Sequence, residues 1–421
     1  MQTQPLDRVK IPSFQISDNY SISQPSVFEC PGGIKLFAFQ NIEQEVVKIQ
    51  FIFEAGSWNE IKPGVSYFTT KMLSNGTTTK SAYEIAEAFD FLGASFKANS
   101  GYDFVSVAIY SLRKNLTSVL KIVADIFNNP SFDERELRLL KQNFIESLRL
   151  KNEVSHLVAS KKIRSAVYGK SHPYGNYLEE TDVIAIERSD LISYYSSNFA
   201  LHSIYLIGRL SDDDIQRIIT QIPFSKKVIK SRNFNISPEG SLKIEKLDSV
   251  QSSIRFAKRS SPKSCTVSHF NSVFFNYLLG GFFGSRLMKN IREQKGLTYG
   301  IYSNLTHFRH DSLWLIGAEV NLRNVEVAKE EIKKEIVRLS IETVPESELE
   351  IAKNSFIGSW HVENSTVFST AEKFQALNLF GLPQNYYNDL LSYIHNLTPK
   401  QFLENISEEF NANDLLEIQV G

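Results

Sequence analysis

Two segments of the sequence, ELRLLKQNFI (Glu136 to Ile145) and ELEIAKNSFI (Glu348 to Ile357), carry the same residues at the same spacing. Glu, Leu, Lys, Phe and Ile agree at matching positions, and the second segment begins 212 residues after the first (348 − 136). A single match of this length between two amphipathic helices arises readily by chance. The fold therefore depends on whether the flanking sequence repeats as well, because an internal repeat defines the architecture.

The flanking sequence does repeat, and in the same order. A strand-like run, VSVAIYSLRKN, and a helical run, LTSVLKIVADIFNNP, precede the first segment, while LWLIGAEVNLRN and VEVAKEEIKKEIVRLSIETVP precede the second. The dipeptide Leu-Arg ends both strand-like runs, at 112–113 and 322–323. This shared order of strand, helix, proline and second helix favours a tandem duplication of two similar units of about 200 residues each.

Each unit mixes strands with long helices. Alternation and β-branched content predict paired strands in the run that follows Glu45, VVKIQFIFEAGS, and in SIRFAKRS from Ser253. Helical runs such as SAYEIAEAFDFLG and the meander-like FKANSGYDFVSVAIYS predict an α+β fold, with antiparallel-dominated sheets and helices packed on them. The loop-like stretch 222–241 predicts an N-terminal domain over 1–225, a linker over 226–242 and a C-terminal domain over 243–421.

Composition excludes several classes of protein. The chain has 421 residues, 42% apolar and 22% charged, with a formal net charge of -1, so no global field attracts nucleic acid or an anionic membrane. Its two cysteines, Cys30 and Cys265, argue against a disulfide framework and a thiolate zinc site. The N-terminal residues lack the apolar core of a signal peptide, and the longest apolar run, VFFNYLLGGFFG, is too short to span a bilayer. We expect a cytoplasmic protein.

Several stretches, taken together, resemble the M16 (insulinase/pitrilysin) metallopeptidase family in its two-domain bacterial form. In the first half these are FIFEAGSWNE, GVSYFTTKMLSNGTTTKS, SHPYGN and LIGRL. In the second half, LLGGFFGSRLMKNIREQKGLTYGIYS is the most specific match. The resemblance covers most of the chain, from about Val27 to the C-terminus. It implies a fold like that of mitochondrial processing peptidase, with two similar α+β domains facing each other across a chamber.

The family's zinc motif is altered in this sequence. Active members carry His-x-x-Glu-His on a helix, so that two histidines on one helical face bind zinc and the Glu serves as general base. The matching positions here hold Tyr67, Thr70 and Lys71. A charged lysine has no lone pair to donate, and a threonine is no base near neutral pH. The resemblance thus implies no metal in this chain and no zinc peptidase activity of the chain alone.

Other metal ligands are scarce. Glu146 lies roughly where the family's third ligand would sit, but a lone Glu on a helix is more often a solvated residue. Among the eight histidines only His307 and His310 are close, and in a strand or turn they need not face the same way. His172 lies beside Pro173 and Gly175, which is typical of a structural turn. The sequence leaves open whether Glu146 or the His307/His310 pair has a role.

Arg292 and Tyr299 are the candidate functional residues of the second half. The run SRLMKNIREQKG predicts a helix with Gly296 just after its end, so Arg292 lies near the helix end and Tyr299 near the start of the next strand. A structural interpretation is open, in which Arg292 caps its helix and Tyr299 is half-buried. The resemblance implies instead an Arg and a Tyr that face a zinc site across the chamber, where Tyr donates to an oxyanion and Arg holds a peptide carbonyl.

Two hypotheses of different classes follow. In the first, the chain is the non-catalytic subunit of a two-chain M16 zinc peptidase. Its partner, a second M16 chain, would carry the intact motif and the zinc, while this chain would close the peptide chamber and supply Arg292 and Tyr299. In the second, the chain is a non-enzymatic peptide-binding or scaffold protein of the same fold. The sequence identifies neither the peptide substrate nor the partner, and self-association stays an alternative to a heterodimer.

Overall fold

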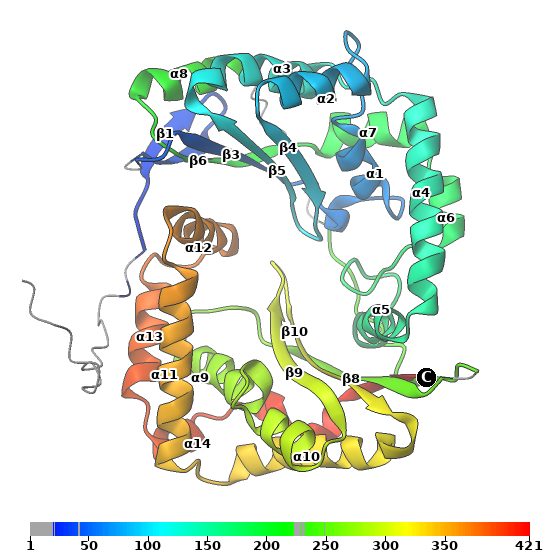
Figure 1. Ribbon diagram of the computed structural model, residues 1–421, viewed down its shortest axis with the longest axis vertical. Helices are drawn as coiled ribbons and strands as arrows, with labels where there is room; N and C mark the ends of the chain where they lie inside the picture. Colours follow the sequence, from blue (N-terminus) through cyan, green and yellow to red (C-terminus); the bar gives the residue numbers. More distant parts are fainter. Residues whose placement is uncertain (1–19, 21, 41–42, 223–228, 230–231, 248) are drawn as a thin grey trace, which may run out of the picture.

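The computed structural model describes most of the chain, and its two halves face each other in Figure 1. The predicted boundary between residues 225 and 226 lies outside the described residues and stays a prediction. No helix in the described ranges is both long enough and apolar enough to cross a membrane. The described residues are 20, 22–40, 43–222, 229, 232–247 and 249–421.

The first half forms a six-stranded sheet in the order β1-β2-β6-β3-β5-β4. All neighbouring strands are antiparallel except β2 and β6. Strand β4 forms one edge of the sheet and is therefore open to pairing on one side. The strands are β1 (Ser26–Cys30), β2 (Ile34–Phe39), β3 (Val46–Phe53), β4 (Ser95–Ser100), β5 (Val105–Leu112) and β6 (Leu201–Ile207).

The second half forms a five-stranded sheet in the order β7-β11-β8-β10-β9, in which only β7 and β11 are parallel. Order and directions match those of β2-β6-β3-β5-β4 in the first sheet, which confirms two similar α+β units with antiparallel-dominated sheets. The strands are β7 (Leu242–Ile244), β8 (Gln251–Ser260), β9 (Thr298–His307), β10 (Ser312–Asn321) and β11 (Leu416–Val420).

Helices cover both sheets, and the two repeated segments lie in equivalent helices, α4 and α11. In the first half the helices are η1 (Ser57–Asn59), α1 (Val65–Met72), α2 (Ala82–Phe91), η2 (Arg113–Asn115), α3 (Leu116–Asn128), α4 (Glu134–Glu153), α5 (Ser155–Tyr168), α6 (Glu180–Ala185), α7 (Arg188–Asn198) and α8 (Asp212–Gln221). In the second half they are α9 (Val267–Asn276), η3 (Tyr277–Gly281), η4 (Met288–Gln294), η5 (Leu322–Asn324), α10 (Val325–Ile341), α11 (Glu346–Glu363), α12 (Val367–Phe380), α13 (Tyr386–Asn396), α14 (Pro399–Glu404), η6 (Glu408–Phe410) and η7 (Ala412–Asp414).

The local sequence explains the central elements. In β5 the buried side chains alternate with half-buried ones, because one face of the strand lies on the core: Val105, Val107 and Ile109 are fully buried. Helix α2 begins at a capping box, in which the Ser81 hydroxyl accepts from the backbone N–H of Glu84 and the Glu84 carboxylate accepts from that of Ser81.

Each half contributes one helix that packs on the sheet of the other half. Helix α5 of the first half packs on β8 and β11 of the second sheet, and α12 of the second half packs on β6 of the first. Phe374 of α12 contacts Phe37 and Phe39, with ring centroids 5.2 and 5.7 Å apart. Nearby, the buried Lys48 of β3 pairs with Glu372 of α12 at 2.8 Å. These contacts tie the two sheets together and set how the halves face each other (Figure 1).

Candidate functional site

The helix with the altered motif, α1, lies against the edge strand β4. It begins after Gly64, whose φ of 87° lies in the left-handed region that favours glycine. Lys71 near its end turns towards β4, where its Nζ donates to the backbone oxygen of Ala98 at 2.7 Å and to Oδ1 of Asn99 at 3.3 Å. Burial lowers the pKa of Lys71. The second histidine position of the motif is thus occupied by a lysine that holds the helix to the sheet edge.

The other two motif positions are part of the packing. The ring of Tyr67 lies 5.3 Å from that of Phe68 and 5.1 Å from that of Phe144 on α4. Thr70, at the position of the general base, is fully buried, and its hydroxyl has no hydrogen-bond partner among the described residues. Neither side chain is an imidazole or a carboxylate of the kind that the motif supplies.

These residues do not fit a zinc ion. The ligand set of the family needs two neutral imidazoles on one face of the helix and a carboxylate from elsewhere in the chain, and Tyr67, Thr70 and Lys71 supply no imidazole. Glu146, the candidate third ligand, is exposed on α4, whereas Phe144 is the α4 residue that lies against Tyr67. In the described part of the chain no three His, Cys, Asp or Glu side chains come together as a metal site.

A carboxyl group that the sequence did not single out lies beside the altered motif. Glu60 is half-buried, and its Oε2 accepts from the backbone N–H of Ser66 at 3.1 Å, in the first turn of α1. Burial raises the pKa of Glu60 from 4.5 to about 7. Glu60 also lines a cavity of about 320 Å³, together with Tyr67, Tyr102 and Tyr177. Glu60 lies between η1 and α1, outside any helix or strand. No hydrophobic periodicity of the sequence therefore marks it as buried.

The side chains of Arg292 and Tyr299 lie beside each other. The Arg292 guanidinium lies 5.3 Å from the centre of the Tyr299 ring and 4.9 Å from that of Phe283. No hydrogen bond joins the guanidinium or the Tyr299 hydroxyl to another described residue. Tyr299 is 91% exposed and Phe283 64%, so the half-buried alternative for Tyr299 is wrong. Gly296, with a φ of 60°, ends the preceding helix as predicted.

The helix that carries Arg292 is itself irregular. The segment η4 has π-helical geometry, in which the backbone bonds span one residue more than in an α-helix. Such turns are frequent at functional sites because they re-aim side chains. Phe283, which the sequence placed in a glycine-rich run, is the third member of this exposed group and was not predicted.

The histidine pair does not converge. His307 Nδ1 lies 2.7 Å from the Ser312 hydroxyl, whereas the ring of His310 stacks on Trp58 of the first half at 4.2 Å. Burial lowers the pKa of His307 to about 3. His172 is buried in a turn, as predicted, where its Nδ1 accepts from the backbone N–H of Tyr174 at 3.1 Å. All three histidines have structural surroundings.

The comparisons with known proteins agree with this geometry. Residues 36–182 match the family described as Insulinase (Peptidase family M16), and residues 185–356 match the Peptidase M16 inactive domain. A Bacillus subtilis protein named uncharacterized zinc protease YmxG is 25% identical over 400 residues, with 92% of each chain covered. A Helicobacter pylori protein named non-peptidase homolog YmxG is 24% identical over 362 residues, with 84% of this chain and 83% of that protein covered.

Solved structures show the same fold. The peptidase M16 inactive domain from Pseudomonas fluorescens superposes with a TM-score of 0.84 at 24% identity, covering 94% of this chain and 98% of that chain. A protease from Helicobacter pylori superposes with a TM-score of 0.82 at 16% identity, covering 94% of this chain and 100% of that one. This two-domain chain therefore belongs to the M16 peptidase family, and it carries Tyr67, Thr70 and Lys71 at the positions of the zinc motif.

Proposed function

We propose that this chain is the non-catalytic subunit of a two-chain M16 zinc peptidase. Its partner, another M16 chain, carries the intact His-x-x-Glu-His motif and the zinc ion. This chain closes the peptide chamber and presents Arg292 and Tyr299 to the partner's site. The observation that carries the proposal is the contact between the half-buried Arg292 and the exposed Tyr299, whose side chains form no hydrogen bond with a described residue. In the same chain Lys71 ties the motif helix to the sheet edge.

The chemistry of the pair suits peptide hydrolysis in a partner's site. A Tyr hydroxyl donates a hydrogen bond to the oxyanion that forms on the scissile carbonyl, and such donors aimed at developing charge lower the barrier most. The planar Arg292 guanidinium offers five donors to peptide carbonyls, and its contact with the Tyr299 ring restricts both side chains. Docking of a partner would exclude water from the pair and strengthen each of these interactions.

The contrast between the two halves supports a division of labour. Random loss of function would alter both sites alike. Here the motif positions have been built into the packing, with Lys71 held on the Ala98 carbonyl, while Tyr299 is exposed, Arg292 is half-buried, and neither is bound to a described side chain by a hydrogen bond. A surface arginine with free donors and an exposed aromatic ring are typical of binding sites in protein interfaces.

The test is to purify the tagged chain gently from its own cells, identify the proteins that accompany it, and measure chelator-sensitive peptide hydrolysis. We expect a second M16 chain with the intact motif. In the reconstituted pair, Tyr299→Phe should lower kcat about 100-fold or more, the usual cost of losing one oxyanion donor. Matched controls are Tyr83→Phe on the exposed face of α2 and Arg323→Ala at an exposed turn, both of which should leave kcat unchanged.

Two results would contradict the proposal. A chain that purifies alone or only with itself, without zinc and without hydrolysis, would exclude a divided enzyme. So would an assembled enzyme whose kcat is unchanged in both Arg292→Ala and Tyr299→Phe. The cytoplasmic location is part of the proposal, and cell fractionation with an antibody to the chain tests it.

A second function, peptide binding without catalysis, is favoured by the cavity of about 320 Å³ beside α1. Tyr67, Tyr102, Tyr177 and Leu178 line it, and aromatic walls of this kind hold extended peptides through apolar contact. In this case unfolded peptides bind the isolated chain, and Arg292→Ala leaves binding unchanged. If the chain is a scaffold in a larger assembly, Arg292→Ala and Tyr299→Phe should both leave its biological activity unchanged.

A further inference from the structure

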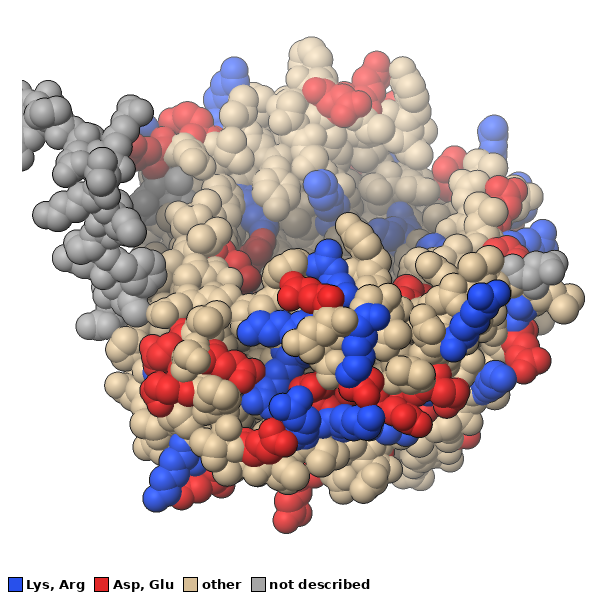
Figure 2. Space-filling model, turned by 60° about the horizontal axis from the view of Figure 1, so that its bottom comes forward, with Lys and Arg blue, Asp and Glu red and all other residues tan. Residues whose placement is uncertain are grey.

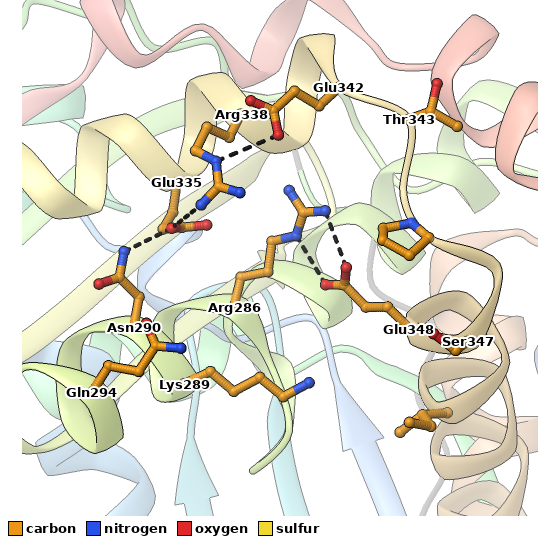
Figure 3. Close-up of a pocket in the computed structure, with 12 residues that line it drawn as sticks. Arg286, Lys289, Asn290, Gln294, Glu335, Arg338, Glu342, Thr343, Ser347 and Glu348 are labelled. Atoms are coloured by element: carbon orange, nitrogen blue, oxygen red, sulfur yellow. Dashed lines mark hydrogen bonds and ion pairs between the residues drawn. The ribbon is translucent and has the colours of Figure 1, made fainter.

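A second pocket lies on the second half, away from the altered motif. It has a volume of about 420 Å³ and lies between η4, the end of α10 and the start of α11 (Figure 3). Acidic and basic side chains intermingle over the face that carries α10, which Figure 2 turns towards the viewer. In the pocket itself three cations, Arg286, Lys289 and Arg338, and three carboxylates come together.

Arg286 is the buried charge of this pocket. Its side chain is only 9% exposed, and its Nε and Nη2 donate to the two carboxylate oxygens of Glu348 at 2.9 and 3.2 Å. Its Nη1 has no hydrogen-bond partner among the described residues. In Figure 3 the Arg286 guanidinium lies between that of Arg338 and the Glu348 carboxylate. A buried donor without a partner is costly, so an acceptor is missing on this side of Arg286.

The other two cations also keep donors free. Arg338 donates from Nη1 to Glu335 at 2.9 Å, and its Nε lies 3.4 Å from Glu342, which leaves Nη2 without a partner in the described part of the chain. Lys289 forms neither a hydrogen bond nor an ion pair with any described side chain, although it lines the same pocket.

Of the three carboxylates, only that of Glu348 has hydrogen bonds on both oxygens. Both oxygens of Glu348 accept from Arg286. The buried Glu335 accepts from Arg338 and from Asn290 Nδ2 at 2.7 Å, both on its Oε1, and Glu342 forms only the longer ion pair with Arg338. The pocket thus has more free donors than free acceptors, although its formal charges balance. A ligand that completes it has to supply acceptors.

The start of α11 offers backbone donors, although Glu346 and Glu348 on its first turn offset its partial positive charge. This helix of 18 residues begins after Pro345, and no side chain caps its N-terminus. The first backbone N–H groups of a helix point outward and carry partial positive charge, which favours a bound anion. The Ser347 hydroxyl, on the first turn, lines the pocket as a further donor.

We propose that this pocket binds a phosphate group, as free phosphate or as the phosphate of a small phosphomonoester. Its tetrahedral oxygens accept several hydrogen bonds at once, which matches the free donors of Arg286 and Arg338, while the unpaired Lys289 side chain lines the same pocket. A single carboxylate has two oxygens in one plane and satisfies fewer of these donors. The pocket shares η4 with Arg292, but the proposal does not rest on the pairing with a zinc-bearing chain.

The experiment is calorimetric titration of the full chain with inorganic phosphate, glycerol phosphate and acetate, in chloride buffers of equal ionic strength. We expect saturable binding of a phosphate compound and none of acetate. Tighter binding of glycerol phosphate than of inorganic phosphate would assign the site to a phosphomonoester, and the reverse to free phosphate. A parallel melting series should show a saturable rise in Tm, because a ligand that binds only the folded chain stabilises it.

Variants make the test specific. Lys289→Ala should weaken phosphate binding about tenfold or more, the effect of losing one charge-assisted hydrogen bond. The chain should fold normally, because Lys289 contributes to no hydrogen bond or ion pair there. Lys334→Ala, an exposed lysine of α10 outside the pocket, is the matched control and should leave the affinity unchanged. Absence of saturable phosphate binding, equal binding of acetate, or equal affinity of both variants would overturn the proposal.

Discussion

The Arg292 guanidinium lies 5.3 Å from the centre of the Tyr299 ring, on the surface of a single chain. The two positions are seven apart in the sequence, and the turn at Gly296, with its φ of 60°, brings the end of η4 back over the start of β9. The pair is thus preformed before any partner binds. Preformed side chains lose less conformational entropy on binding, so the arrangement is suited to act on a ligand that another protein holds.

The lack of hydrogen-bond partners at Arg292 and Tyr299 leads to a prediction on stability. Arg292→Ala and Tyr299→Phe should change the free energy of unfolding by less than about 0.5 kcal/mol, as is usual for surface positions without buried partners. Urea unfolding of the purified chain measures this. The buried Tyr194, whose hydroxyl donates to the backbone oxygens of Ala55 and Gly56 at 2.9 Å each, is the matched control. Tyr194→Phe should cost about 1 kcal/mol or more.

A loss of about 2 kcal/mol in Tyr299→Phe would contradict this prediction and assign the residue a structural role. Any loss of kcat in an assembled enzyme could then be due to misfolding. Near-wild-type stability together with a large loss of kcat is the combination that the proposed function requires.

Much of the fold could be predicted from the sequence, because the repeat around Glu136 and Glu348 gives the element order twice. The exchange of α5 and α12 could not, since the period of a helix shows that it has an apolar face but not which sheet that face covers. The partner of Lys71 was hidden for a related reason. Ala98 accepts through its backbone oxygen, so its residue type carries no signal.

The candidate site was likewise predictable from the sequence only in part. Arg292 and Tyr299 belong to one continuous run with a predictable helix end, whereas Phe283 precedes that helix in a glycine-rich stretch where its exposure carries no pattern. Glu60 lies in a turn before α1, and only burial by the first turn of that helix distinguishes it from a surface carboxylate. Contacts that depend on the tertiary fold therefore escaped prediction.

The unpartnered hydroxyl of Thr70 predicts a stabilising substitution. Thr70→Val removes a buried oxygen that bonds to no described residue and keeps the branched shape, so we expect the free energy of unfolding to rise by about 1 kcal/mol. Ser66, one turn earlier, is the control, because its buried hydroxyl donates to the Ala55 oxygen at 2.6 Å. Ser66→Ala should lower stability by about 1 kcal/mol. Equal effects of the two changes would show that the Thr70 hydroxyl does have a partner.

Glu60 predicts a pH dependence of stability. Burial raises the pKa of its carboxyl in the folded chain to about 7, against 4.5 for the ordinary group. Between these values the folded state holds a proton that the unfolded state has released, so this contribution to stability is full below pH 4.5 and is lost as pH rises to about 7. The difference in unfolding free energy between wild type and Glu60→Gln, followed from pH 5 to 8, isolates it. A difference that does not vary with pH would show that Glu60 ionises at its ordinary pKa.

The contact between Lys48 and Glu372 predicts how firmly the halves are joined. The Lys48 side chain is 4% exposed in the first sheet, and the Glu372 carboxylate of α12 lies 2.8 Å from its Nζ. Glu372→Gln should lower the free energy of unfolding by about 1–2 kcal/mol, because a buried ammonium loses its charged partner. In that background Lys48→Met should recover stability, since no charge is then left buried.

Lys373 gives the matched control for this cross-half pair. It neighbours Glu372 on α12 but pairs with Glu363 of the same half, and both side chains are partly exposed. Lys373→Gln should therefore change stability by less than about 0.5 kcal/mol. Urea unfolding followed by tryptophan fluorescence and by circular dichroism measures all of these variants. If Glu372→Gln behaves like Lys373→Gln, water reaches Lys48 in solution, and the aromatic contacts of Phe374 rather than the ion pair hold α12 on the first sheet.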